Sequence, residues 1–291
     1  MHLEIFIVIG RIVSSAFANV FQKKLTHHGL HPFFIVMMSY AVLSIICIPL
    51  LWTFQYTQLN TGFWINMFLA ALLDMAGTLF LVMSLSKTDL SVFGPLNAYK
   101  IVISMLLAML FLGEVPNSQG FIGIAIIVVG SFFLFPSQQT INTNRIVQLF
   151  SEQGVQYRFL SILLFSVGTL PLKNAVIVGG ALPTTVFWCL IGLPLAVLAN
   201  SLFIGRFTEQ LKSSKQHLYS FIYLGILIFL MQYMTMMVLS KLYIAYSLAL
   251  FQLSMILQVF LGYRIFNEQH LIRRLAACLI MVVGSLLVIK A

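Results

Sequence analysis

The stretch Leu85–Phe135, which reads LSKTDLSVFGPLNAYKIVISMLLAMLFLGEVPNSQGFIGIAIIVVGSFFLF, occurs a second time in this chain in related form. A shift of 154 residues lays Leu85-Ser86-Lys87 on Leu239-Ser240-Lys241. The same shift lays Val128-Val129-Gly130-Ser131 on Val282-Val283-Gly284-Ser285, and no gap is needed between the two matches. A constant offset over this length predicts an internal duplication.

The composition is that of a polytopic membrane protein. The residues are 60% hydrophobic and only 8% charged, against roughly 25% charged in soluble domains. A bilayer core about 30 Å thick needs about 20 apolar residues per helix. We therefore predict an all-α membrane protein with ten transmembrane helices, at Leu3–Leu25, Pro32–Phe54, Phe63–Ser86, Ser91–Leu112, Gln119–Phe135, Tyr157–Val178, Thr184–Ile204, Leu218–Ser240, Leu242–Phe266 and Leu271–Ile289.

The ten runs fall into two halves. Residues 1–136 and 157–291 each hold five runs, and the polar segment 137–156 is predicted to be a linker. Because five is odd, the second copy must enter the membrane from the opposite side, which predicts inverted repeats around a central cavity near the midplane. Both repeats lie in one chain, so a monomer can form the complete predicted cavity. The first run has spanning length and no small-residue cleavage site, and we expect it to be a retained helix.

Lysine and arginine are distributed unequally between the two sides of the predicted membrane. One side has only Lys241 and Lys290. The other side has Lys23, Lys24, Lys87, Arg145, Arg158, Arg206, Lys212, Lys215, Arg264, Arg273 and Arg274. The positive-inside rule makes the crowded side cytoplasmic and places both termini outside. Topology thus explains the net charge of +9 without a nucleic-acid partner, since no dense basic cluster is present.

Polar residues follow single faces of several predicted helices. In the first helix Arg11, Ser15, Ala18 and Gln22 step by four, three and four residues, which places them on one face. Polar atoms concentrate in the first, third, fourth, sixth, eighth and ninth helices. We predict a substrate site formed by Arg11, Ser15, Asp74, Thr78, Asn97, Lys100, Ser104, Lys173, Gln232, Tyr233, Ser254 and Gln258.

The three charges Arg11, Asp74 and Lys100 carry most of this prediction. A charge at the bilayer centre costs at least about 2.5–3.5 kcal/mol and is by default a functional-site hypothesis. The alternative is a structural ion pair between Asp74 and either base. One acid cannot neutralise two bases, so a spare positive charge favours an anionic substrate. Lys173 could equally snorkel to the interface, and the neutral polar residues could simply bond neighbouring helices.

Other residue types give little sign of chemistry. Cys47, Cys189 and Cys278 are isolated in predicted helices, and all six histidines lie at helix ends or in loops. We therefore expect neither a metal site nor a cofactor. Glu114 and Glu268 occupy matching turns before the fifth and tenth helices, where a carboxylate favours a capping role. The fifth helix carries Gly120, Gly123 and Gly130 and is predicted to pack closely against a neighbour.

The turn Phe111-Leu-Gly-Glu-Val-Pro-Asn-Ser-Gln-Gly120, followed by Ile-Val-Val-Gly130, resembles the EamA-type members of the drug/metabolite transporter superfamily. The second half echoes it at Phe266-Asn-Glu268, where Asn267 replaces the usual Gly. The resemblance implies a secondary transporter with alternating access between the halves. Small multidrug relatives carry an essential Glu in the first helix, and Arg11 in its place makes export of lipophilic cations a poor fit.

We therefore expect an inner-membrane transporter, and more specifically an exporter, of a small polar metabolite such as an amino acid or an organic anion. Arg11 and Lys100 would bind the anionic group, while Asp74 would bind an ammonium group or couple transport to protons. Transport of a lipid-borne head group and drug export are the alternatives. An enzyme is not expected, because no metalloprotease motif or nucleophile and histidine arrangement is present.

Overall fold

The computed structural model describes residues 2–54, 59–112, 117–131, 133–134, 151–204, 207–241 and 244–289, and these residues are almost entirely helical. The long helices are α1 (His2–His27), α2 (Pro32–Cys47), α3 (Thr61–Leu85), α5 (Tyr99–Leu112), α6 (Ser118–Ser131), α8 (Gln153–Gly179), α9 (Ala181–Phe203), α11 (Leu218–Lys241), α13 (Ser254–Phe266) and α14 (Leu271–Ile289). The shorter ones are η1 (Ile48–Thr53), α4 (Leu90–Phe93), η3 (Pro95–Ala98), α10 (Phe207–Ser214), η4 (Lys215–His217) and α12 (Ile244–Gln252).

Seven helices in the described part of the chain are long and apolar enough to cross a membrane. They correspond to the first, second, third, sixth, seventh, eighth and tenth predicted runs. The predicted runs Ser91–Leu112 and Leu242–Phe266 are each divided into shorter helices, and α6 covers 14 residues of Gln119–Phe135. The multi-pass, all-helical class is therefore confirmed, while the number ten remains a prediction.

Both divided helices break at positions that the 154-residue offset makes equivalent. The first half passes from η3 to α5 between Ala98 and Tyr99, and the second half from α12 to α13 at Gln252–Ser254. In the first half, Pro95 lacks a backbone N–H and so loosens the divided helix at this point. In the second, the Ser254 hydroxyl donates to the carbonyl oxygen of Phe251 at 2.8 Å, a local bond that competes with regular helix geometry.

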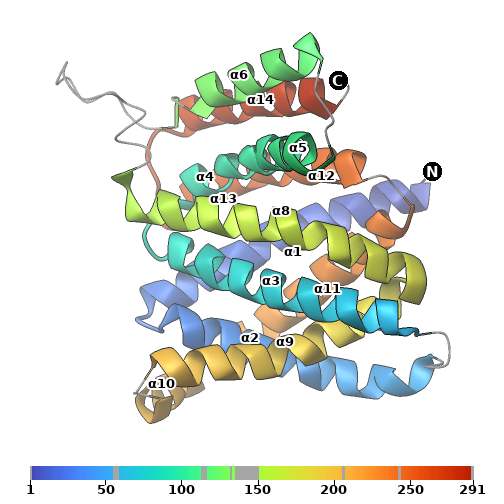
Figure 1. Cartoon of the computed structure of the whole chain (residues 1–291). Coiled ribbons are helices and arrows are strands. Elements are labelled where there is room, and N and C mark those ends of the chain that lie inside the picture. The colour runs from blue at the N-terminus through green and yellow to red at the C-terminus, as the bar shows by residue number, and fades with distance from the viewer. Residues whose placement is uncertain are drawn as a thin grey trace.

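The helices pack in layers (Figure 1), with α6 and α14 at one edge of the molecule and α2 and α9 toward the opposite edge. Four pairs of neighbours dominate the packing, namely α1 with α11, α3 with α8, α2 with α9 and α6 with α14. Each pair joins one helix from each half of the chain. The two halves are therefore interleaved rather than forming separate domains.

The turns between α1 and α2 and between α8 and α9 contain equivalent glycines. Gly29 has φ 79° and Gly180 has φ 76°, in the left-handed region that glycine adopts without a steric penalty. Asn267 occupies the same region at the end of α13, with φ 53°. Asparagine is the other residue that tolerates this conformation, which explains how Asn267 can replace the glycine usual in this family turn.

Glycines bring α6 and α14 into close contact, as the sequence predicted for this helix. A Cβ on Gly123 would lie 2.8 Å from the carbonyl oxygen of Gly284, and a Cβ on Gly284 would lie 2.8 Å from that of Gly123. Membrane helices associate largely through this kind of backbone approach, because lipid offers no hydrophobic driving force between them.

Replacing Gly284 with alanine should therefore destabilise the α6–α14 pair. Overpacking of a close contact costs about 1–3 kcal/mol, and both backbones would have to move. Unfolding of the purified protein in mixed micelles titrated with dodecyl sulfate measures the loss. Val283→Leu is the matched control, since Val283 is 53% exposed on the same helix. Equal stability of Gly284→Ala and wild type would show that this contact is not tight.

Apolar side chains form two main clusters. One is built from α2, α3, α9 and α11 with parts of α1 and α8, and includes Phe34, Phe63 and Trp188. The other is built mainly from α5, α12, α13 and α14, and includes Tyr99 and Phe251. A third, smaller cluster surrounds the start of α4. The three cysteines are buried within this packing and form no disulfide.

Candidate functional site

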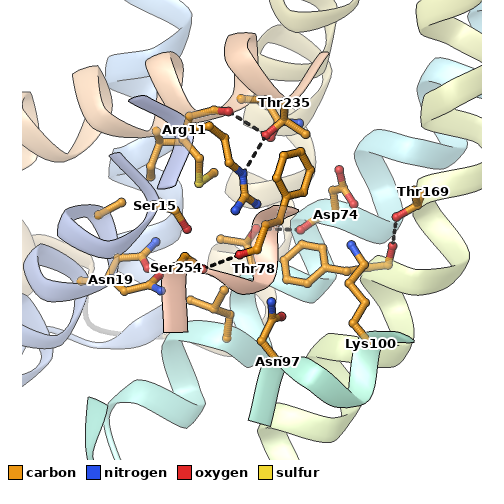
Figure 2. Close-up of a pocket in the computed structure, with 18 of the residues that line it drawn as sticks. Arg11, Ser15, Asn19, Asp74, Thr78, Asn97, Lys100, Thr169, Thr235 and Ser254 are labelled. Carbon is orange, nitrogen blue, oxygen red and sulfur yellow. Dashed lines mark hydrogen bonds between the residues drawn. The ribbon is translucent and has the colours of Figure 1, made fainter. Parts of the chain in front are cut away.

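A cavity with both polar and apolar lining residues lies between the two main apolar clusters. It contains about 1230 Å³ of space free of protein atoms, part of it open to solvent. Its wall combines helices of both halves, and Figure 2 shows Arg11, Asp74 and Lys100 directed toward a common space from α1, α3 and α5. Nine predicted site residues line it, namely Arg11, Ser15, Asp74, Thr78, Asn97, Lys100, Gln232, Ser254 and Gln258.

Three predicted site residues do not line the cavity. Lys173 donates to the backbone carbonyl of Leu239. The ring of Tyr233 stacks on Phe229, with 6.3 Å between the ring centroids. Ser104 lies a turn beyond Lys100 along α5 and is only partly buried. Ser104 and Lys173 were chosen by helical spacing, which fixes a face of a helix but not how far along the helix the cavity extends. Tyr233 was chosen only as a polar residue beside Gln232, and adjacent residues point to different faces.

The first helix supplies one continuous polar wall of the cavity. Arg11, Ser15, Asn19 and Gln22 all line it, at the steps of three and four residues that keep side chains on one face. Arg11 Nε donates to Thr235 Oγ1 at 3.3 Å, and its guanidinium carbon lies 3.8 Å from the centre of the Phe251 ring. The Arg11 side chain of α1 thus contacts α11 and α12 of the second half.

Asp74 is held by a residue that the sequence did not single out. Its Oδ2 accepts a hydrogen bond from Trp188 Nε1 at 2.9 Å, and the side chain is buried. Trp188 lies on α9, which is not among the helices where the sequence concentrates polar residues. Gly168 of α8 leaves room for the carboxylate, since a Cβ there would lie 3.1 Å from Oδ1. Asp74 is thus fixed by a neutral donor.

Lys100 extends from the second residue of α5 into the cavity. Its Nζ lies 5.8 Å from the centre of the Phe165 ring, within the distance at which a cation is attracted to an aromatic face. Among the described residues it forms no direct ion pair with Asp74. The contacts of Arg11 and Asp74 are likewise to neutral groups. Asp74 and Lys100 therefore interact as opposite charges across the cavity without touching.

Arg158 is a cavity residue whose charge the sequence analysis counted only with the cytoplasmic side of the membrane. It lies in the second turn of α8, is 4% exposed and lines the cavity. Its Nη2 donates to Asn97 Oδ1 at 3.0 Å. A signal for it was present, because Arg158, Ile162, Phe165 and Thr169 step by four, three and four residues along one face of α8. Because Arg158 was counted among the charges that set the membrane orientation, it was not considered as a site residue.

The two helix breaks meet beside the cavity. Asn97 Nδ2 donates to Gln252 Oε1 at 3.3 Å, and Gln252 Nε2 donates to the carbonyl oxygen of Asn97 at 3.3 Å. Asn19 on α1 also donates to Gln258 Oε1 on α13 at 3.0 Å. Side-chain amides therefore join the two halves across the cavity wall.

A second polar cluster lies outside the cavity, centred on Glu268. Its Oε1 accepts from the backbone N–H of Leu90 at 2.6 Å, and its Oε2 from that of Ser91 at 2.8 Å. Lys23 Nζ and Arg274 Nη1 lie 3.4 and 3.5 Å from the carboxylate. Glu268 is a cap, as predicted, but it caps α4 of the other half instead of its own helix. Glu114 lies outside the described residues.

The geometry can be set beside known proteins. Residues 2–135 match the model of the EamA-like transporter family. The match covers the first half of the chain and includes the Leu-Gly-Glu turn, so it confirms the resemblance that this turn carries to a family of membrane transporters. No curated protein matches the sequence significantly.

The fold of this chain also occurs among solved structures. A structure titled "Crystal structure of protein" superimposes with a TM-score of 0.61 over 96% of this chain and 95% of its own. The two sequences are 13% identical. At that identity the likeness shows a shared fold and says nothing of substrate.

Proposed function

We propose that this EamA-like protein is a secondary transporter of a small polar metabolite with an anionic group, an organic anion or an amino acid. In this proposal it works by alternating access between two inverted halves, as an exporter in an inner membrane. The observation that carries the proposal is the cavity, in which Arg11, Lys100 and Arg158 face a single acid, Asp74, among the described lining residues. Buried charges without counter-charges mark substrate and ion pathways in membrane proteins.

Helix pairing supports the inverted-repeat part of the proposal. The sequence offsets of 151 and 154 relate α1 to α8 and α3 to α11. Exchanging the halves therefore turns the α1–α11 pair into the α8–α3 pair, and both pairs are packed. The same exchange turns the contact of Gly123 with Gly284 into that of Ala277 with Gly130, where a Cβ on Gly130 would lie 3.4 Å from the Ala277 carbonyl oxygen.

The direction of the helices supports inversion as well. Lys23, near the end of α1, donates to the carbonyl oxygen of Thr88 at 2.6 Å. Gln153, at the start of α8, accepts from the neighbouring Lys87 at 2.7 Å. The end of one helix therefore lies where its counterpart begins. We assign this end to the cytoplasm from the Lys and Arg distribution, which leaves both termini outside.

Asp74 has a separate place in the proposed mechanism. It is the acid of the cavity and its Trp188 bond holds it in one orientation. In that position it would bind the ammonium group of a zwitterion, or take up a proton when no such group is present. Protonation of Asp74 would change the charge of the cavity by one, which is what coupling to a proton gradient requires.

Counterflow in proteoliposomes tests the proposal. The panel consists of labelled amino acids, small organic anions and cationic dyes, with protein-free liposomes as the control. We expect saturable exchange of an anion or zwitterion. Exchange of dyes alone would identify a drug exporter, and movement of a lipid-borne head group alone would identify a lipid transporter. Either result would refute the proposed substrate class while leaving the fold intact.

A further inference from the structure

Arg158 has hydrogen-bond donors that the protein does not use. Its Nε and Nη1 are buried and have no partner among the described residues. Its one side-chain bond, to the neutral amide of Asn97, leaves the positive charge uncompensated. Buried polar groups nearly always have partners, and a buried charge without one is strongly destabilising. The missing partner is therefore expected to arrive with a ligand.

The surroundings hold the guanidinium ready for an oxyanion. Its central carbon lies 3.9 Å from the centre of the Phe93 ring, so one face is stacked while the N–H edge remains available. Asn97, which fixes Nη2, is itself bonded to Gln252 of the other half. Arginine in this stacked, pre-oriented state is suited to carboxylate and phosphate oxygens.

The charges of the whole cavity indicate how much negative charge the ligand brings. Three cations, Arg11, Lys100 and Arg158, line it together with one carboxylate, Asp74, which leaves two positive charges in excess. A ligand with two negative charges would neutralise this excess. A zwitterion would leave it unchanged, and a monoanion would remove half.

We infer that Arg158 is a substrate-binding residue and that the substrate is a small dianion, either a dicarboxylate or a phosphate monoester. This inference rests on the proposed transport function and narrows it from polar metabolites in general. Arg158 binds one oxyanion group at the junction of the two broken helices, and Lys100 and Arg11 bind the remaining negative charge. Because the junction belongs to both halves, the bound dianion contacts both parts that move in alternating access.

Three four-carbon ligands of different charge, with one phosphate ester, test the inference on the purified, detergent-solubilised protein. Succinate carries two charges, butyrate carries one, and 4-aminobutyrate is a zwitterion; glycerol 3-phosphate separates phosphate esters from dicarboxylates. A ligand that binds the folded state raises its melting temperature by mass action. We expect succinate or glycerol 3-phosphate to stabilise the protein at concentrations at least about tenfold lower than butyrate or 4-aminobutyrate.

Three variants locate the effect. Arg158→Gln should weaken binding of the dianion at least about 30-fold, as expected when one partner of a buried charge pair is removed. Arg264→Gln removes the same charge from an exposed position on α13 and should leave binding unchanged. Asn97→Asp loses the donor to Gln252 but places a carboxylate beside Arg158, and this new ion pair should keep the protein folded while dianion binding is lost. It keeps the test valid if Arg158→Gln does not fold.

Two outcomes would overturn the inference. One is binding of butyrate or 4-aminobutyrate as tight as that of the dianions. The other is wild-type dianion binding by both Arg158→Gln and Asn97→Asp. Failure of the broader transport proposal looks different, because no anion or zwitterion would then stabilise or exchange through the wild-type protein.

Discussion

Lys100→Glu is expected to abolish transport of the anionic substrate. The substitution removes a cation from the cavity wall and adds a second acid near Asp74, so the excess positive charge disappears. Losing one partner of a buried charge pair costs about 2–5 kcal/mol of binding free energy, and every 1.4 kcal/mol is about tenfold in affinity. Transport should therefore fall at least about 30-fold at substrate concentrations below saturation.

The measurement is initial exchange rate in proteoliposomes with matched amounts of protein. Lys215→Glu is the control, because it makes the same change of charge at an exposed position in η4. Lys100→Arg keeps the cation and should retain part of the rate. Monodisperse behaviour in detergent shows that each variant is folded. If Lys100→Glu transported the wild-type substrates at the wild-type rate, the cavity would not be the substrate site.

Glu268→Ala is expected to cause the largest loss of stability. The Glu268 side chain is 7% exposed and accepts hydrogen bonds from the first two backbone N–H groups of α4. It also faces Lys23 and Arg274, which are 4% and 5% exposed. Removing the acid leaves the buried Lys23 without its ion-pair partner, while Arg274 keeps its pair with Asp89 at 2.7 Å. Breaking a buried pair costs about 3–5 kcal/mol.

Titration with dodecyl sulfate in mixed micelles would measure this loss. Glu152→Ala removes an exposed acid at the start of α8 that forms no side-chain capping bond, and its effect should stay within about 0.5 kcal/mol. Combining Glu268→Gln with Lys23→Met removes one cation together with the acid and should recover part of the stability. Wild-type stability of Glu268→Ala would show that solvent satisfies these groups.

The Glu268 cluster also connects the two halves of the chain. It joins α1 and α4 of the first half to the end of α13 and the start of α14 of the second. In the proposed orientation these contacts lie at the cytoplasmic end of the molecule and join the two halves there.

Sequence periodicity predicted most of the helices and much of the cavity. Apolar runs of spanning length identify membrane helices because the bilayer sets their length. Charges such as Arg11, Asp74 and Lys100 stand out because hydrocarbon excludes them. Both signals are local, so they can be read from a single segment. The close packing of α6 was accessible for the same reason, since its glycines mark one face of one helix.

Other features depended on partners far apart in the chain. The bond of Trp188 to Asp74 joins residues whose sequence contexts are unremarkable, and Glu268 caps a helix almost 180 residues earlier. Arg158 was counted with the cytoplasmic cations, because only the packed helices show that its side chain is buried. The offset between halves could indicate a duplication, but not that the two breaks would meet.

The sequence by itself determined that this protein is a helical membrane protein, written as a duplication, with charges where lipid does not tolerate them. The physical reason is that the membrane constrains each segment separately, through length, hydropathy and the cost of a lone charge. Only the tertiary structure decided which charges share a cavity, which donors lack partners and which acid holds the halves together. Those properties belong to contacts between helices, and no single segment contains them.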